Sequence, residues 1–307
     1  MKIQQLRYFV AVYEEGSFSA GAARVNATQS GLSMHVRQLE TRYDVTLLTR
    51  SSAGVQPTEA GRIFYRQAIS VLNAAAHAED TLKELSGVVS DHIRIGLMPT
   101  FTGSVLSPAM LRHARDHPHV RVSIQEAYSA NLSDQVAEGA LDFAVVPAVQ
   151  SDLRLDASLM ATDRECLVVA GNSELARGRN SVCLADLPPL RLVLPSAVNA
   201  RRPRIENYLS VNGIKVAETM ELDAMLGTLD MVASSEWTSI LPAVLGRSDR
   251  DGIKRRFLPL TDPPLSVDYM RISNTARPLG RAARAFADIL QEELNTALEA
   301  GPEPVYA

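Results

Sequence analysis

The sequence predicts a mixed α/β protein with a small helical unit at its N-terminus and a larger unit of alternating strands and helices. Three observations lead to this fold class. The first 58 residues show helical spacing and then a short hairpin pattern, residues 59–85 read as one long helix, and strand and helix patterns alternate from His92 onward. A chain of 307 residues that is 46% hydrophobic and 21% charged exceeds one typical domain, so two or three units are expected.

The first two helices are predicted from the spacing of apolar residues and from the residues that cap them. Apolar side chains recur at helical intervals from Ile3 to Tyr13, and Gly16 ends this helix. Ser17 is a good N-cap for a short second helix, which breaks at residues 26–27.

A third helix, from residue 29 to about residue 43, follows Thr28, which is another good N-cap. Its buried stripe is formed by Leu32, Val36 and Leu39, spaced four and then three residues apart. This spacing turns a second set of side chains outward: Gln29, Ser30, Ser33, Met34 and Arg37. Two helices with a tight break between them have the form of a helix-turn-helix, whose second helix enters the DNA major groove.

A small hairpin and a long helix are predicted next. Residues 47–57 read as two short strands around a Ser-Ser-Ala-Gly turn, the wing of a winged helix. Thr58 caps a helix that runs to about residue 85. We expect this linker helix to pair with a second copy through an apolar seam of Ile69, Leu72, Ala76, Leu82 and Leu85.

Strands and helices alternate through the rest of the chain. Strands expected at residues 92–97, 120–126 and 141–146 are separated by helices expected at residues 102–116 and 131–138, which predicts a parallel sheet. Similar alternation follows over residues 166–241, then a strand at 265–272 and a closing helix at 277–298. The predicted parts are residues 1–58, 59–90 and 91–300, the last with lobe 1 at 91–162 and 268–300 and lobe 2 at 163–267, and a disordered tail at 301–307.

Composition and motifs exclude several classes of protein. No apolar run reaches membrane-spanning length and the N-terminus lacks a signal peptide, so we expect a cytoplasmic protein with no membrane contact. Cys166 and Cys183 fit free thiols, and a redox pair is the alternative. The chain has no Walker loop, dinucleotide fingerprint or nucleophile elbow, and only His113 and His117 are spaced for a metal. We therefore expect no enzyme activity, no cofactor and no metal.

Several segments carry a family resemblance. LRYFVAVYEEGSFSAGAARV, TQSGLSMHVRQLE and LLTRSSAGVQPTEAG resemble the N-terminal signature of LysR-type transcriptional regulators, and HPHVRVSI, EGALDFAVV and VASSEWTSILP are similar to later segments of that family. The resemblance implies a winged helix-turn-helix, a linker helix that pairs in the dimer, and a two-lobed effector domain like a periplasmic-binding protein. It also implies a homodimer that assembles into a homotetramer on double-stranded promoter DNA, a small-molecule effector, and RNA polymerase as a partner.

By this resemblance, the DNA contacts fall at the start of the third helix and beside the wing. They are Thr28, Gln29, Ser30, Ser33, Met34, Arg37 and Arg50. A Gln side chain can pair with adenine, and an Arg can hold phosphate. Alternatively, the two serines are ordinary first-turn residues and Arg37 is a solvated charge. The chain departs from the common family pattern at Ser30-Gly31 and at Met34, so a preferred base sequence does not transfer.

The effector is expected between the lobes, beyond the carboxyl ends of the strands. The candidates in lobe 1 are Thr100, Phe101, Thr102, Ser129 and Asn131; those in lobe 2 are Asn199, Arg201, Arg202, Trp237 and Thr238. Paired arginines favour an anionic effector, and a tryptophan beside the cleft favours an aromatic one. The alternatives are a solvated helix start for the arginines and core packing for the tryptophan.

Two classes of function follow. The leading one is a ligand-responsive DNA-binding transcription regulator. The other is a solute-binding or catalytic α/β protein with an incidental helical N-terminal appendage. The missing signal peptide and the intact wing favour the regulator.

Overall fold

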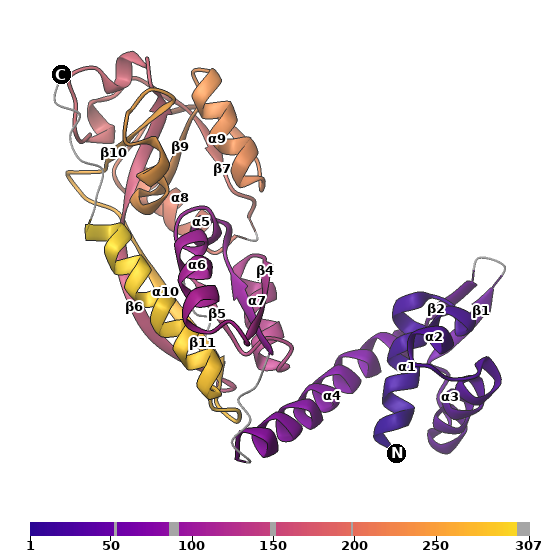
Figure 1. Ribbon diagram of the computed structural model, residues 1–307. Helices are drawn as coiled ribbons and strands as arrows, with labels where there is room; N and C mark the ends of the chain where they lie inside the picture. The colour runs from indigo at the N-terminus through magenta and orange to yellow at the C-terminus, as the bar shows by residue number, and fades with distance from the viewer. Residues whose placement is uncertain (52–53, 86–91, 148–151, 198, 300–307) are drawn as a thin grey trace. The chain divides into compact units, whose positions relative to one another are not determined.

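The structure is a computed structural model that describes all residues except 52–53, 86–91, 148–151, 198 and 300–307 (Figure 1). The chain divides near residue 90 into two compact units, and each is described by itself. The predicted tail at 301–307 lies outside the described residues.

The first unit contains three short helices, a hairpin and a long helix, as the sequence predicts. In order they are α1 (Ile3–Glu15), α2 (Phe18–Arg24), α3 (Gln29–Tyr43), β1 (Leu48–Ser51), β2 (Gly54–Pro57) and α4 (Glu59–Leu85). The two strands pair antiparallel, with Leu48 opposite Pro57. In Figure 1, α1, α2, α3 and the hairpin cluster at one end of α4.

Local capping interactions explain where these helices begin and end. Gly16 ends α1 in the left-handed conformation, with φ of 59°. The Ser17 hydroxyl accepts a hydrogen bond from the Ala20 amide at 3.4 Å, and the Thr28 hydroxyl accepts one from the Gly31 amide at 3.2 Å. The Thr58 hydroxyl accepts a hydrogen bond from the Gly61 amide at 3.0 Å, so all four predicted capping residues are confirmed.

The packing of α4 differs from the predicted seam. Ile69 and Leu72 pack against the core of their own unit, which contains Phe9 and Leu32. This face of α4 therefore contacts the helix-turn-helix and is not available to a second copy. Ala76 is half-buried, and the side chain of Leu85 lies outside the described residues.

A different stripe of α4 faces solvent, and Leu82 is its only member from the predicted seam. The large apolar side chains exposed among the described residues of α4 are Ile63, Val71 and Leu82, with exposed fractions of 49%, 42% and 67%. Exposed Ala74 and Ala78 lie between them at helical spacing. We call these five residues the exposed stripe of α4.

The second unit is a mixed sheet covered by helices. Its strands are β3 (His92–Leu97), β4 (Arg121–Glu126), β5 (Phe143–Val146), β6 (Leu155–Ala170), β7 (Leu190–Leu194), β8 (Val216–Glu221), β9 (Thr238–Pro242), β10 (Arg255–Pro259) and β11 (Ser266–Asn274). Its α-helices are α5 (Pro99–Thr102), α6 (Leu106–Asp116), α7 (Ser129–Ala137), α8 (Arg201–Val211), α9 (Met225–Ser234) and α10 (Arg281–Glu299). Three 3₁₀-helices complete it: η1 (Glu174–Ala176), η2 (Leu184–Asp186) and η3 (Ala243–Asp249).

Strand β6 belongs to both lobes. Its first part, Leu155–Arg164, pairs antiparallel with β11 in lobe 1, and its second part pairs with β9 and β10 in lobe 2. The strand order is β4-β3-β5-β11-β6-β9-β7-β8, with β10 also on β6. The sequence pattern predicted only the second part, from Cys166 onward, because the first part is mostly exposed or half-buried and has no run of buried apolar residues.

Lobe 1 confirms the predicted parallel βαβαβ arrangement, since β3 pairs parallel with both β4 and β5. The helix predicted at 102–116 is two helices, α5 and α6, because the first turn ends at Gly103. The long helix α10, yellow in Figure 1, lies along β6 and β11, and its buried residues join the core of lobe 1. In the part of the chain that the structure describes, no helix is long and apolar enough to cross a membrane.

Candidate DNA-binding surface and ligand cleft

Four of the predicted DNA-reading residues lie together on one face of α3. Leu32, Val36 and Leu39 are buried in the core of the first unit, which fixes the opposite face toward solvent. A shallow depression of about 550 Å³ lies on that face and is lined by Ser30, Ser33, Met34, Arg37, Gln38, Thr41 and Arg42. The depression therefore brings together four of the seven predicted residues.

The other predicted DNA residues lie around this depression. Thr28 caps α3, and Gln29 is exposed in its first turn. The side chain of Arg50 lies outside the described residues. Sequence reasoning missed Gln38, Thr41 and Arg42, which continue the helical spacing of Ser30, Met34 and Arg37 and could have been found by extending that spacing.

The residues predicted for the lobe 1 side of the effector site lie at the carboxyl ends of β3 and β4. The hydroxyl of Thr100 is buried without a hydrogen-bond partner among the described residues, and the residue is 3% exposed. The hydroxyl of Thr102 contacts the Glu126 carboxylate at the end of β4. Phe101 is not part of the cleft: it is fully buried in the core of lobe 1, edge-on to the Tyr269 ring.

The start of α7 supplies the remaining predicted residues of lobe 1. Ser129 is half-buried and begins the helix, and the Asn131 side chain is exposed and accepts a hydrogen bond from Gln135 at 2.6 Å. The backbone amides of the first turn of α7 have no partner within the helix, as at any helix start.

A hydrogen bond joins the two lobes between the segments that follow β4 and β8. The Tyr128 hydroxyl, from lobe 1, donates to the carbonyl oxygen of Asp223 in lobe 2 at 2.7 Å. The Asp223 carboxylate in turn accepts a hydrogen bond from the Ser196 amide at 3.0 Å. Burial, with Asp223 and Glu126 nearby, raises the pKa of Tyr128 to about 12, so the phenol keeps its proton and remains a donor. The Ser196 hydroxyl is buried without a partner among the described residues.

Tyr128→Phe should lower the free energy of unfolding of the second unit by about 1 kcal/mol, because it removes one hydrogen bond. Hydrogen exchange of the Ser196 amide should also become faster, since the bridge that holds its partner Asp223 is lost. Tyr208→Phe is the matched control, because the Tyr208 hydroxyl donates to the Pro263 carbonyl at 2.7 Å within lobe 2. Equal acceleration at Ser196 in both variants would contradict the bridging role of Tyr128.

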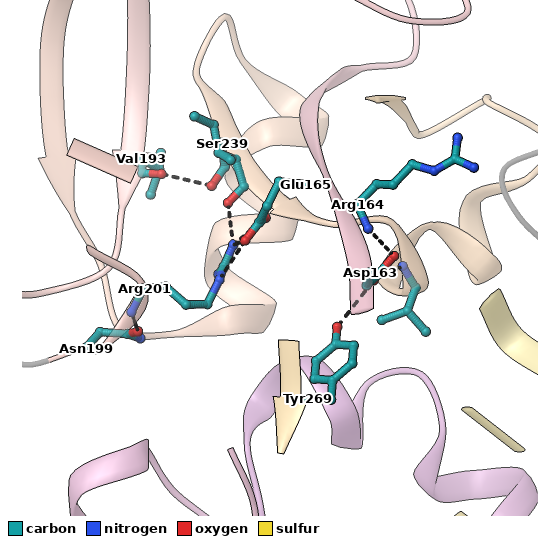
Figure 2. Close-up of polar contacts among 10 residues, drawn as sticks. Asp163, Arg164, Glu165, Val193, Asn199, Arg201, Ser239 and Tyr269 are labelled. Carbon is teal, nitrogen blue, oxygen red and sulfur yellow. Dashed lines mark hydrogen bonds and ion pairs between the residues drawn. The ribbon is translucent and has the colours of Figure 1, made fainter. Parts of the chain in front are cut away.

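Arg201 does not offer its guanidinium to a ligand. Its Nε and Nη2 donate to the Glu165 carboxylate at 2.7–3.1 Å, Nη2 also donates to the Ile240 carbonyl at 3.0 Å, and both side chains are almost fully buried (Figure 2). The Asn199 side-chain oxygen accepts a hydrogen bond from the Arg201 backbone amide at 3.0 Å. Arg201 thus ties α8 to β6 and is removed from the candidate effector ligands.

Arg202 is also engaged within its own lobe. Its Nη1 donates to the Pro195 carbonyl at 2.7 Å, and its Nε donates to the Glu206 carboxylate at 2.7 Å. The side chain is only 15% exposed. Arg202 therefore holds the loop after β7 in place, while Arg201 holds α8 on β6. The sequence could not reveal the pairing of Arg201, because Glu165 is 36 residues away.

Trp237 and Thr238 lie at the wrong end of the lobe 2 sheet for the predicted cleft. Strands β7 and β9 run parallel, and Thr238 pairs with Leu192, ahead of the carboxyl end of β7. The Thr238 hydroxyl donates to the Arg191 carbonyl at 3.0 Å and is buried, while Trp237 is half-buried. Because ligands bind at the carboxyl ends of such strands, both residues are removed from the candidate effector site.

Strand β6 carries a second buried carboxylate two residues before Glu165 (Figure 2). Asp163 accepts hydrogen bonds from the Arg164 amide at 2.7 Å, the Val244 amide at 2.9 Å and the Tyr269 hydroxyl at 3.3 Å. Burial, together with the nearby Glu165 charge, raises the pKa of Asp163 to about 6 in spite of these bonds. Sequence reasoning missed both carboxylates, because an acidic residue in a polar strand segment carries no signal of burial.

Asp163→Asn should make the stability of the second unit less dependent on pH between about 4 and 6. The carboxyl of Asp163 holds its proton up to about pH 6 in the folded protein, but only to about pH 3.9 in the unfolded chain. Its contribution to the free energy of unfolding is therefore fully present below about pH 3.9 and is lost as the pH rises to about 6. The loss is on the order of 3 kcal/mol in the wild type. Thermal unfolding of both proteins from pH 4 to 8 measures the difference, and parallel curves would contradict the assignment.

Cys166 lacks the setting of a reactive thiol. Cys166 is fully buried, and burial raises the pKa of its thiol well above the usual value. The Cys183 thiol donates to the Asp262 carbonyl at 3.4 Å. Both cysteines are free.

A helix-turn-helix with an exposed polar and basic face, joined to a two-lobed α/β unit, defines a DNA-binding regulatory protein. Two family models match the chain: "Bacterial regulatory helix-turn-helix protein, lysR family" over residues 3–62 and "LysR substrate binding domain" over residues 86–295. The chain belongs to the LysR family of transcriptional regulators, whose members are regulators and not enzymes.

Curated relatives agree with this assignment, and solved structures share the fold. The nitrogen assimilation regulatory protein nac of Klebsiella aerogenes is 27% identical over 299 residues, 94% of each chain. The HTH-type transcriptional regulator PgrR of Escherichia coli K12 is 32% identical over 238 residues, 75% of this chain and 76% of the relative. A full-length OxyR variant from Pseudomonas aeruginosa shares the fold with a TM-score of 0.73 at 19% identity, over 100% of this chain and 99% of its own. Full-length CbnR, solved in complex with its target DNA, shares the fold with a TM-score of 0.70 at 19% identity, over 97% of this chain and 100% of its own.

Proposed function

We propose that this regulator binds promoter DNA through α3 as a homodimer that assembles into a homotetramer, and that a small anionic effector controls it. We place it in the cytoplasm, with RNA polymerase as its functional partner at the promoter. The likeness to CbnR, which was solved with its target DNA, supports the DNA-binding mode. The exposed stripe of α4 supports a dimer, because an apolar face of this length needs a partner helix.

The buried Thr100 hydroxyl is the observation that carries the effector proposal. A buried donor without a partner costs free energy until a ligand supplies an acceptor. The Ser196 hydroxyl in lobe 2 is likewise buried without a hydrogen-bond partner among the described residues. An effector carboxylate would satisfy both kinds of donor, with the free amides at the start of α7.

The charges at the cleft edge narrow the effector class. Arg201 and Arg202 are engaged by protein groups, while Glu126 and Asp223 add negative charge. We therefore propose a monoanion, held by hydroxyls and amides and not by a guanidinium. The aromatic character expected from Trp237 no longer has support.

Control would act by a shift in population between two lobe arrangements. The Tyr128–Asp223 hydrogen bond holds one arrangement. An effector that binds one arrangement better than the other changes its population, and linkage carries the change to DNA binding.

The experiment is a titration of DNA from the upstream intergenic region with full-length protein, followed by fluorescence anisotropy over a range of salt concentrations. Arg37→Ala should weaken binding and reduce the salt slope by about 1, whereas Arg177→Ala, an exposed arginine of the second unit, should not. Salt-insensitive binding would contradict DNA recognition through α3.

The effector arm repeats this titration with a panel of small monocarboxylates. Thr100→Val should abolish the response to the active compound, and Thr238→Val, which removes a buried hydroxyl at the opposite end of the lobe 2 strands, should retain it. A response that survives Thr100→Val would reject the proposed effector site.

A further inference from the structure

Met34 is an exposed apolar residue on a face of α3 that is otherwise polar and basic. Its exposed fraction is 51%, although Leu32 and Val36 on the same helix are buried. The other residues that line the depression around it are Ser30, Ser33, Arg37, Gln38, Thr41 and Arg42. Those side chains can hydrogen-bond to base edges or phosphates. The Met34 side chain consists of a thioether and three carbons, so it gains free energy mainly by burial against an apolar group.

The major groove offers one apolar group to such a side chain. Of the four base pairs, only those with thymine present a methyl group there, at C5, and the remaining groove atoms are hydrogen-bond donors and acceptors. An apolar side chain at the centre of a groove-reading face therefore favours a thymine opposite it.

The neighbours of Met34 leave room for that methyl group. Helical side chains lean toward the N-terminus, over the residues three and four positions earlier, which here are Gly31 and Ser30. A Cβ atom added at Gly31 would meet only the Thr28 hydroxyl, at 3.0 Å, so the space above Gly31 opens away from the protein. Gly31 thus leaves the space on the N-terminal side of Met34 free of any side chain other than Thr28 within 4 Å of the added Cβ atom.

We propose that Met34 is a specificity-determining residue that contacts the C5 methyl group of one thymine in each half-site. This assignment rests on the proposed function, since it needs α3 in the major groove. It gives the operator one position where thymine is preferred, beside the bases that the polar residues of the depression reach.

The experiment begins with selection of a preferred duplex from a random pool by the full-length wild-type protein. Each thymine of the selected half-site is then replaced by deoxyuridine, which removes only the C5 methyl group, and Kd is measured for wild type and Met34→Ala. At one position the replacement should raise Kd about fourfold for the wild type, the fold-change of one methyl-sized apolar contact of ~0.8 kcal/mol, and leave Met34→Ala almost unchanged.

Two further variants test the source of the effect. Met34→Leu should retain the preference, because it keeps an apolar side chain at this position. Tyr43→Ala is the matched control: Tyr43 is 54% exposed on the same helix but does not line the depression, so its loss should leave the deoxyuridine effect of the wild type intact.

The outcomes separate this assignment from the proposed function. Sequence-specific binding in which deoxyuridine has the same effect on wild type and Met34→Ala at every thymine would overturn the role of Met34 and leave the proposed function standing. Selection of no preferred duplex by the wild type would overturn both.

Discussion

Glu165→Ala should lower the free energy of unfolding of the second unit by about 3–5 kcal/mol. The substitution leaves the Arg201 guanidinium buried, 8% exposed, without the carboxylate that accepts its Nε and Nη2 protons. A buried charge that loses its partner keeps its desolvation cost and loses the attraction that offset it. Chemical denaturation of the full-length protein, followed through the transition of the second unit, measures the change.

Glu174→Ala is the matched control for this prediction. Glu174 pairs with Arg177 at 3.2 Å, but the two side chains are 79% and 80% exposed, so water replaces the lost interaction. We expect a change within about 0.5 kcal/mol. The double variant Glu165→Leu with Arg201→Met should regain much of the stability lost in Glu165→Ala, since no charge is left buried. Similar losses in Glu165→Ala and Glu174→Ala would contradict the structural role of the buried pair.

Gly61→Ala should destabilise the first unit by about 3 kcal/mol and weaken DNA binding with it. A Cβ atom at this position would run into the carbonyl oxygen of Leu47, and would lie 3.1 Å from its carbonyl carbon. The same carbonyl oxygen accepts a hydrogen bond from the Thr58 amide at 3.0 Å. A shift of Leu47 that relieves the clash would therefore also disturb the start of α4. Thermal unfolding and anisotropy with DNA both measure the effect.

Gly227→Ala tests whether the loss of stability in Gly61→Ala depends on the close approach of Gly61 to the Leu47 carbonyl. Gly227 lies in α9, where an added Cβ atom would come no closer than 3.5 Å to the Ala224 Cβ. Alanine is the better helix former there, so we expect a gain of up to about 1 kcal/mol. A loss at Gly227 equal to that at Gly61 would mean that close packing against Leu47 is not the cause.

Features that depend on neighbours in the sequence were predicted well. The caps Gly16, Ser17 and Thr28 each act within four residues, and the buried stripe Leu32, Val36 and Leu39 follows from helical geometry alone. The exposed face of α3 is the other side of that stripe, so most of its residues could be predicted as well.

Features that depend on distant partners could not be predicted. The sequence presents Arg201 as a charge at a helix start, and only the fold brings Glu165 beside it. The position of Trp237 depends on the register between β7 and β9, which apolar strand patterns leave open. Likewise, Ile69 and Leu72 look like a dimer seam until the helix-turn-helix packs on them.

The shared strand β6 has a consequence for how the second unit unfolds and moves. Its hydrogen bonds to β11 and to β9 and β10 belong to one unbroken backbone, in which residues 155–164 pair with lobe 1 and residues 165–170 pair with lobe 2. The lobes are therefore coupled through one continuous strand, and a fragment that ends between residues 162 and 165 would lack β11, which lies between β5 and β6 in lobe 1, as well as the strands of lobe 2. A change in the angle between the lobes, as proposed above, would have to bend this continuous strand, which limits the amplitude of the change.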